Sequence, residues 1–179
     1  MRDIVLDGES LKIRDVVETG LGKTIVSLSN KAREKMENSR LGINRILQSG
    51  ETTYGVNTGF GALSSVSIDS DKLEALQVNL IRSHACGVGE EMENKHTLMM
   101  MLIRANTLCR GNSGARPLIV DTLISMINHK ICPAIPRIGS LGASGDLAPL
   151  SHLAMGMMGE GFCYIMDEGG NWNKVCLLY

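Results

Sequence analysis

The sequence has no excess of charge of either sign and no long hydrophobic run. Its 18 lysines and arginines nearly balance 19 aspartates and glutamates, so it offers no basic field to nucleic acid or to a membrane surface. The longest apolar stretch, Leu98 to Ile103, is far too short to cross a bilayer. We therefore expect no nucleic-acid partner and no membrane, and instead a small molecule or a second copy of the chain.

The sequence also lacks a recognisable leader and a framework of paired cysteines. Met1 to Leu6 carries two charges and no apolar core, unlike a signal or transit peptide, and this predicts a cytoplasmic location. The five cysteines are odd in number, widely spaced and without a C-x-x-C pair, which argues against disulfides. His84 and Cys86 have no further ligands at zinc spacing, so we expect no metal.

What the sequence does contain is helical patterns separated by glycine and proline. A hydrophobic fraction of 44% in 179 residues is sufficient for one domain with a genuine core. Pro133 and Pro136 predict a linker. We expect a mainly α fold with little β. Capping residues and apolar spacing predict helices over Ser10–Thr19, Ser29–Ser49, Asp71–Cys86, Asn94–Arg110, from Pro117 onward and Asp146–Met158, and a β-like run over Phe162–Met166.

Two of the predicted helices have informative faces. In Asp71–Cys86 the spacing of three and four places Leu73, Leu76, Leu80 and His84 on one side, so His84 is expected to point inward. The helix over Asn94–Arg110 is apolar nearly all round, which is typical of the inside of a bundle. We expect this second helix to promote self-association unless further neighbours cover it.

Two glycine-rich loops are the places where chemistry is expected. They span Tyr54–Gly61 (YGVNTGFG) and Gly139–Asp146 (GSLGASGD). Neither has the strand-to-helix context of a phosphate-binding loop, so we expect no nucleotide.

Ala143, Ser144 and Gly145 could together form an electrophile. The Gly145 amide has no Cβ beside it, so a tight bend could bring its nitrogen onto the Ala143 carbonyl carbon and close a five-membered ring. Loss of that carbonyl oxygen and of the Ser144 hydroxyl as two waters would leave a methylidene on a conjugated imidazolone. An isolated Ala-Ser-Gly, however, is more often an ordinary turn before a helix.

Three motifs carry a family resemblance. The segment Gly139–His152 (GSLGASGDLAPLSH) resembles the signature of the aromatic amino-acid ammonia-lyases that use a methylidene-imidazolone. The resemblance extends to Tyr54–Gly61 and to Asn79–Gly89 (NLIRSHACGVG), and the motifs occur in the family's order. The resemblance implies the family's fumarase- or aspartase-like helical fold, in which these loops form the active site.

The resemblance also implies roles for individual residues. Ala143, Ser144 and Gly145 would form the 4-methylidene-imidazol-5-one cofactor, and Asp146 would assist the cyclisation. Tyr54 would be the catalytic base. Because Asp146 opens a predicted helix, the positive end of that helix could also stabilise negative charge at the ring. Whether the substrate amine or its aromatic ring attacks the methylidene is left open by the sequence.

His84 is the residue that bears on substrate choice. A histidine on an apolar helix face is often a satisfied core residue, but the pair Ser83–His84 resembles the histidine-acting members of the family. His84 would then contact the imidazole of an amino-acid substrate, and the reaction would convert L-histidine to trans-urocanate and ammonia. The alternatives are a tyrosine or phenylalanine lyase, an aminomutase of the same family, and a non-catalytic helical assembly module.

The resemblance predicts that residues 1–179 are the N-terminal portion of one longer lyase chain. That portion contains a catalytic loop, 54–61, and a cofactor-forming segment, 139–146. The rest of the family's central helical bundle and its carboxylate-binding groups would lie outside it. The resemblance implies a homotetramer for the full-length protein, whose sites combine several subunits, and we expect these 179 residues alone to be inactive.

Overall fold

A computed structural model describes residues 1–59, 68, 72–142 and 145–177. More of these residues are helical than extended, which confirms the mainly α class. The helices are α1 (Ile13–Gly20), α2 (Asn30–Ser49), α3 (Leu73–His84), α4 (Asn94–Leu108), α5 (Pro117–Asn128) and α6 (Leu147–Met157). The strands are β1 (Arg2–Leu6), β2 (Thr24–Leu28), β3 (Val88–Glu91), β4 (Ile131–Pro133), β5 (Pro136–Ile138), β6 (Gly161–Met166) and β7 (Trp172–Leu177).

Several helix ends coincide with the residues that predicted them. The hydroxyl of Ser29 accepts a hydrogen bond from the Ala32 amide at 3.1 Å and caps α2, as expected for an N-cap serine. The same helix ends at Gly50, whose φ of 71° is the left-handed conformation that glycine adopts without strain. Pro117 occupies the first turn of α5. All six predicted helices are confirmed, with ends displaced by up to three residues.

Most of the strands were not anticipated. The predicted run over Phe162–Met166 is confirmed as β6, which lies between β4 and β7 in an antiparallel sheet. β1 and β2 form a parallel pair and β3 and β5 an antiparallel pair. The prediction of a linker at Pro133 and Pro136 was wrong, because Pro133 ends β4 and Pro136 begins β5. β4 and β5 are short, and their partners, β6 and β3, are remote in sequence.

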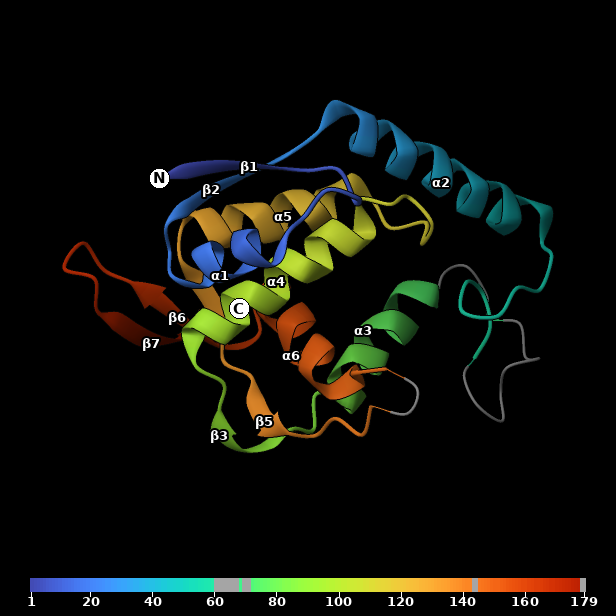
Figure 1. Cartoon of the computed structure of the whole chain (residues 1–179). Helices are drawn as coiled ribbons and strands as arrows, with labels where there is room; N and C mark the ends of the chain where they lie inside the picture. Colours follow the sequence, from blue (N-terminus) through green and yellow to red (C-terminus); the bar gives the residue numbers. More distant parts are fainter. Residues whose placement is uncertain (60–67, 69–71, 143–144, 178–179) are drawn as a thin grey trace.

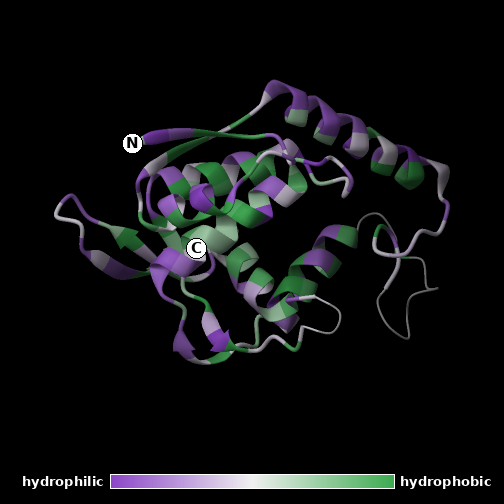
Figure 2. Ribbon diagram, viewed as in Figure 1, coloured by the Kyte–Doolittle hydropathy of each residue, from purple (hydrophilic) through white to green (hydrophobic). Residues whose placement is uncertain are grey.

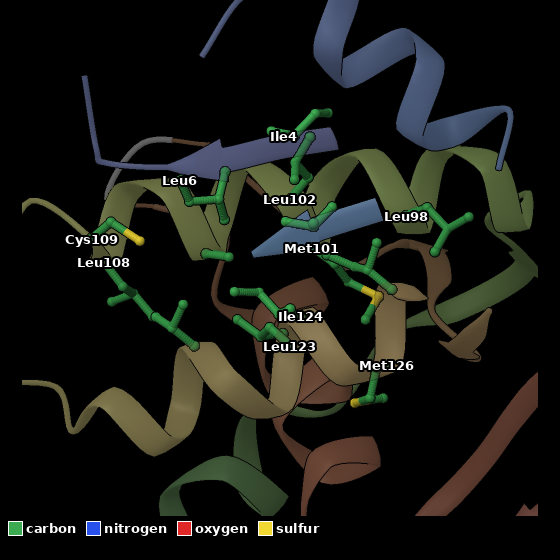
Figure 3. Close-up of a cluster of buried hydrophobic side chains, with 14 of the residues drawn as sticks. Ile4, Leu6, Leu98, Met101, Leu102, Leu108, Cys109, Leu123, Ile124 and Met126 are labelled. Carbon is green, nitrogen blue, oxygen red and sulfur yellow. The ribbon is translucent and has the colours of Figure 1, made fainter. Parts of the chain in front are cut away.

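The core is built around α4, which packs against α1 and α5. Figure 3 shows Leu98, Met101 and Leu102 of α4 gathered with Ile4 and Leu6 of β1 and with side chains of α5. Burying one such side chain contributes about 1.5–3 kcal/mol. The chain itself therefore supplies the neighbours that cover α4. The expectation that α4 would promote self-association for want of such neighbours loses its basis.

The helices divide into the α4–α5 core and a second pair, which is joined to that core by the buried Leu153 of α6. α3 packs against α6, and both lie to one side of the α4–α5 core (Figure 1). α2 runs along another edge, where only Ala32 and Met36 among its residues are buried. α2 is the more hydrophilic and α5 the more hydrophobic of the two helices (Figure 2). Among the described residues, no helix has the length and apolar character needed to span a membrane.

Candidate active site

Two of the candidate residues, His84 and Asp146, lie at the ends of the neighbouring helices α3 and α6. His84 is the last residue of α3, and Asp146 immediately precedes α6. Ala143 and Ser144 lie outside the described residues. Gly145 has a φ of 108°, and a Cβ built on it would meet no atom of the described residues within 4 Å. The backbone conformation at this position is thus one that glycine favours.

A hydrogen bond spans the cofactor-forming segment. The hydroxyl of Ser140 donates to Oδ1 of Asp146, six residues further along the chain. Asp146 occupies the N-cap position of α6, as predicted, but its carboxylate makes no capping bond to that helix. Its carboxylate instead ties together the two flanks of the Ala143–Gly145 triad. Ser140 was not singled out from the sequence, although its place in the glycine-rich loop was the available signal.

The side chain of His84 is half-buried on the same face of α3 as Leu73, Leu76 and Leu80. Its Nδ1 lies 2.9 Å from the Leu80 carbonyl oxygen and 3.0 Å from the Ser83 hydroxyl. When Nδ1–H donates to that carbonyl, Nε2 is the nitrogen that can accept a hydrogen bond from another group. The predicted inward orientation is therefore partial, because α3 has no fully buried residue.

Tyr54 lies in a turn that is braced by Asn57. The Asn57 side chain accepts from the Thr53 amide at 2.8 Å and donates to the Glu51 carbonyl at 2.9 Å. Asn57 is buried, whereas the Tyr54 side chain is 63% exposed. Asparagine favours such turns because its side chain bonds to nearby backbone, and this was the signal by which Asn57 could have been found.

The described part of the chain does not bring the Tyr54 turn to His84. In Figure 1 the segment over residues 51–59 lies beyond the N-terminal end of α3, and His84 ends the same helix on the other side. A helix of this length spans about 18 Å at 1.5 Å per residue. The structure thus carries His84 and Asp146 at the ends of two helices that pack together, whereas the Tyr54 turn lies at the opposite end of α3 from His84.

Two polar links join the end of α3 to α6 and the turn after it. Nε2 of His152, on α6, accepts a hydrogen bond from the Gly87 amide at 3.1 Å. The guanidinium of Arg82 donates to both carboxylate oxygens of Glu160, at 3.0 and 2.7 Å. Glu160 is buried, which makes a two-pronged arginine a suitable partner. Neither link was predicted from the sequence.

The electrostatics of the α3–α6 pair favour a neutral imidazole at His152. Burial lowers the pKa of His152, because the charged ring is desolvated. A neutral ring has one acceptor nitrogen, and the Gly87 amide is placed to use it. Within the ranges that the structure describes, no three His, Cys, Asp or Glu side chains are grouped so as to hold a metal ion.

Comparison with known proteins gives a consistent picture. The family model described as aromatic amino acid lyase matches residues 11–174. A histidine ammonia-lyase from Staphylococcus saprophyticus is 49% identical over 164 residues, which are 91% of this chain and 33% of that protein.

Two solved structures are similar in fold. The crystal structure of histidine ammonia-lyase from Trypanosoma cruzi has a TM-score of 0.84 and 37% identity, and the match covers 97% of this chain and 32% of that one. Tyrosine aminomutase from Streptomyces globisporus has a TM-score of 0.85 and 36% identity over 96% of this chain and 31% of that one.

The chain thus spans about a third of the length of the curated relatives that it matches. The family model nevertheless covers most of its residues, including α3, the glycine-rich segment 139–146 and α6. The similarity therefore includes the elements that carry His84 and Asp146. The chain belongs to the aromatic amino acid lyase family.

Proposed function

We propose that residues 1–179 are the N-terminal part of an ammonia-lyase that converts L-histidine to trans-urocanate and ammonia. One observation carries this proposal: His84 is the last residue of α3, and α3 packs against α6, the helix that directly follows the triad-containing segment. The His84 imidazole thus lies on the helix next to the one that follows the segment proposed to cyclise. The 49% identity to a histidine ammonia-lyase over 91% of the chain supports histidine as the substrate.

The residues around the triad fit the proposed 4-methylidene-imidazol-5-one. Gly145 has the positive φ of a tight bend. The Ser140–Asp146 hydrogen bond holds the two flanks of the segment together, which would help the Gly145 nitrogen to approach the Ala143 carbonyl carbon. The finished group would supply an electrophilic carbon, which no standard side chain offers. No metal and no nucleotide enter this proposal.

Other residues would bind the substrate and move its proton. His84 would exchange a hydrogen bond with the substrate imidazole through the ring nitrogen that does not face Leu80. Tyr54 would remove the β-proton as a phenolate. The N-terminal end of α6 would favour negative charge beside Asp146.

We further propose a homotetramer for the whole protein, acting in the cytoplasm on a free amino acid. Its sites would combine residues of several subunits, and the separation of the Tyr54 turn from His84 is compatible with such sharing. Nucleic acid and membrane have no part in the proposal, in keeping with the balanced charge of the sequence.

The proposal is tested in the full-length protein by mass and by product. The peptide that contains residues 143–145 should weigh less than its sequence by two waters, and histidine should yield urocanate, followed by its ultraviolet absorbance. Ser144→Ala should retain both waters and lose activity by orders of magnitude, because alanine has no hydroxyl to eliminate. A Ser144→Ala protein with near-normal turnover would end the cofactor proposal.

The choice of histidine is tested at His84. His84→Leu should lower kcat/KM for histidine roughly tenfold or more, since an unpaired buried polar partner costs about 1–3 kcal/mol. Phenylalanine and tyrosine should become relatively better substrates. Unchanged kcat/KM for histidine would assign His84 a packing role instead.

An aminomutase is the second candidate, because tyrosine aminomutase matches this chain about as well in fold as the lyase does. It would return the amino group to the β-carbon. Chromatography of the products with histidine and with tyrosine distinguishes the two activities, since only an aminomutase would form a β-amino acid.

A further inference from the structure

Residues of β5, of the following loop and of α6 approach closely at Gly87, three residues after His84. A Cβ at Gly87 would lie 3.1 Å from Nε2 of His152 and 3.1 Å from Cβ of Pro136. A Cβ at Gly139 would lie 3.0 Å from the Gly87 Cα. Such approaches are tighter than most Cβ contacts, and glycine avoids them because it has no Cβ. The turn after α3 therefore lies against the start of the cofactor-forming segment, at Gly139, and against His152 of α6.

His152 makes the directed contact at this close approach. It lies within α6 and reaches back to the Gly87 amide with Nε2. Both the amide and the ring are partly buried, so losing this acceptor would leave a donor without its partner. The bond links α6 to the turn that immediately follows His84.

Among the described residues, the polar contacts made by the His84 ring are local to α3, through Leu80 and Ser83. Its position relative to residues 139–146 must therefore depend on how α3 is attached. One attachment, Arg82–Glu160, reaches the turn after α6, at the end remote from Asp146. Another, Gly87–His152, holds the turn after His84 to the middle of α6. Without His152, α3 would keep its ion pair, but the turn after His84 would lose its link to α6.

We propose that His152 is a positioning residue that, through the Gly87 amide, fixes His84 relative to Gly139 and Asp146, described residues on either side of the triad, and so sets how well a substrate side chain fits. The inference rests on the proposed function and goes beyond it by assigning substrate fit to a residue that does not touch the substrate. A displaced His84 would contact the substrate side chain less well, so we expect the loss in substrate binding more than in the chemical step.

The test compares three variants of the full-length enzyme. His152→Leu removes the acceptor, His152→Gln keeps an acceptor oxygen on a side chain of similar reach, and His129→Leu makes the same change at an exposed histidine on the end of α5. His152→Leu should raise KM for histidine by about tenfold or more, with a smaller change in kcat. His152→Gln should restore KM to within about threefold, and His129→Leu should match the parent enzyme.

Two measurements distinguish a positioning role of His152 from a general loss of structure. Hydrogen–deuterium exchange of the peptide around Gly87 should accelerate in His152→Leu and remain slow in His152→Gln, with the loss of two waters retained in both. In a double-mutant cycle, His152→Leu should add little to His84→Ala, because both changes act through His84. This coupling would not arise from a purely structural role.

Each remaining outcome counts against the inference. Unchanged exchange at Gly87 in His152→Leu, no rescue by His152→Gln, or full additivity with His84→Ala would each overturn it. If His152→Leu does not fold, the exchange of the peptide around Gly87 and the KM for histidine are measured in His152→Gln. A value of either that differs from the expected one would count against the inference. If the full-length enzyme acts on tyrosine instead of histidine, the proposed substrate is refuted. The exchange around Gly87, and the double-mutant cycle with tyrosine as substrate, would still test the positioning role of His152.

Discussion

The α4–α5 core and the α3–α6 pair are held by different kinds of contact. α4 buries six of its residues against neighbours supplied by the same chain, whereas α3 buries none completely. Arg82–Glu160 and Gly87–His152 supply polar links between α3 and the α6 region, and Ser140–Asp146 spans the adjoining loop. Apolar burial is non-directional and strong, while hydrogen bonds fix geometry at a modest net gain. The stability of the fold and the geometry of the site can therefore be altered separately.

The largest effect that this comparison predicts concerns residues 1–179 alone. The chain should fold around its core, yet it should show no histidine turnover, because it lacks the groups proposed to fix the substrate carboxylate. Orientation alone can be worth about 7–11 kcal/mol in an assembled site. Circular dichroism and thermal melting would report the fold, and urocanate absorbance the activity. Measurable turnover by these residues as a monomer would contradict the prediction.

The next effect is a difference in stability between two leucines. Leu102→Ala in α4 should lower the free energy of unfolding by about 2–5 kcal/mol, because Leu102 is fully buried and leaves a cavity. Leu76→Ala, the same change on the half-buried face of α3, should cost about half of that or less. Urea unfolding of the two variants measures both. Equal losses would mean that α3 is packed as firmly as α4.

The helices could be predicted from sequence because their signals are local. Ser29, Gly50 and Pro117 act within a turn of their own positions, and capping and backbone preference need no distant partner. Strands such as β4 and β5 have only three residues and depend on pairing with remote segments. Their sequences contain proline and no alternation, so nothing local distinguished them from a linker.

The candidate site divides in the same way. The glycine-rich loop over 139–146 indicated Asp146, and helical spacing with the Ser83–His84 pair indicated His84; the structure carries the two residues at the ends of adjoining helices. The residues that join these helices were missed, because Gly87–His152 spans 65 positions and Arg82–Glu160 spans 78. A single sequence has no signal for such pairs, since each member is an ordinary helix or turn residue by itself.

A smaller effect is expected at the ion pair of the α3–α6 region. Glu160→Gln should lower the free energy of unfolding by about 1–2 kcal/mol, since the buried acceptor loses its charge beside Arg82. The loss stays below that of a fully buried pair because the Arg82 side chain is 48% exposed and solvent screens it. Glu168→Gln, at an exposed position after β6, is the matched control. A loss of the same size in both variants would show that the ion pair adds no specific stability.

The smallest effect lies at the edge of the core, in the turn after β1. Asp7 accepts hydrogen bonds from the amides of Glu9 and Ser10, each at 2.8 Å. These bonds, with that from Ser10 foremost, lower the pKa of Asp7 to about 2 from an ordinary value of 3.8. The carboxylate should therefore stabilise the fold above an ordinary aspartate pKa, and this contribution should disappear as the pH falls through about 2.

Asp7→Ala and Asp7→Asn isolate that contribution. Asp7→Ala should lower the urea midpoint slightly at neutral pH, and its difference from the parent chain should vanish in acid. Asp7→Asn keeps an acceptor oxygen at every pH, so it should retain part of the stability and lose the pH dependence. A difference between Asp7→Ala and the parent chain that is constant from neutral pH to acid would assign the effect to packing. The turn at Asp7 would then be stabilised by packing, as the core is. Stabilisation by directed polar contacts would then be a property of the α3–α6 pair and not of this turn.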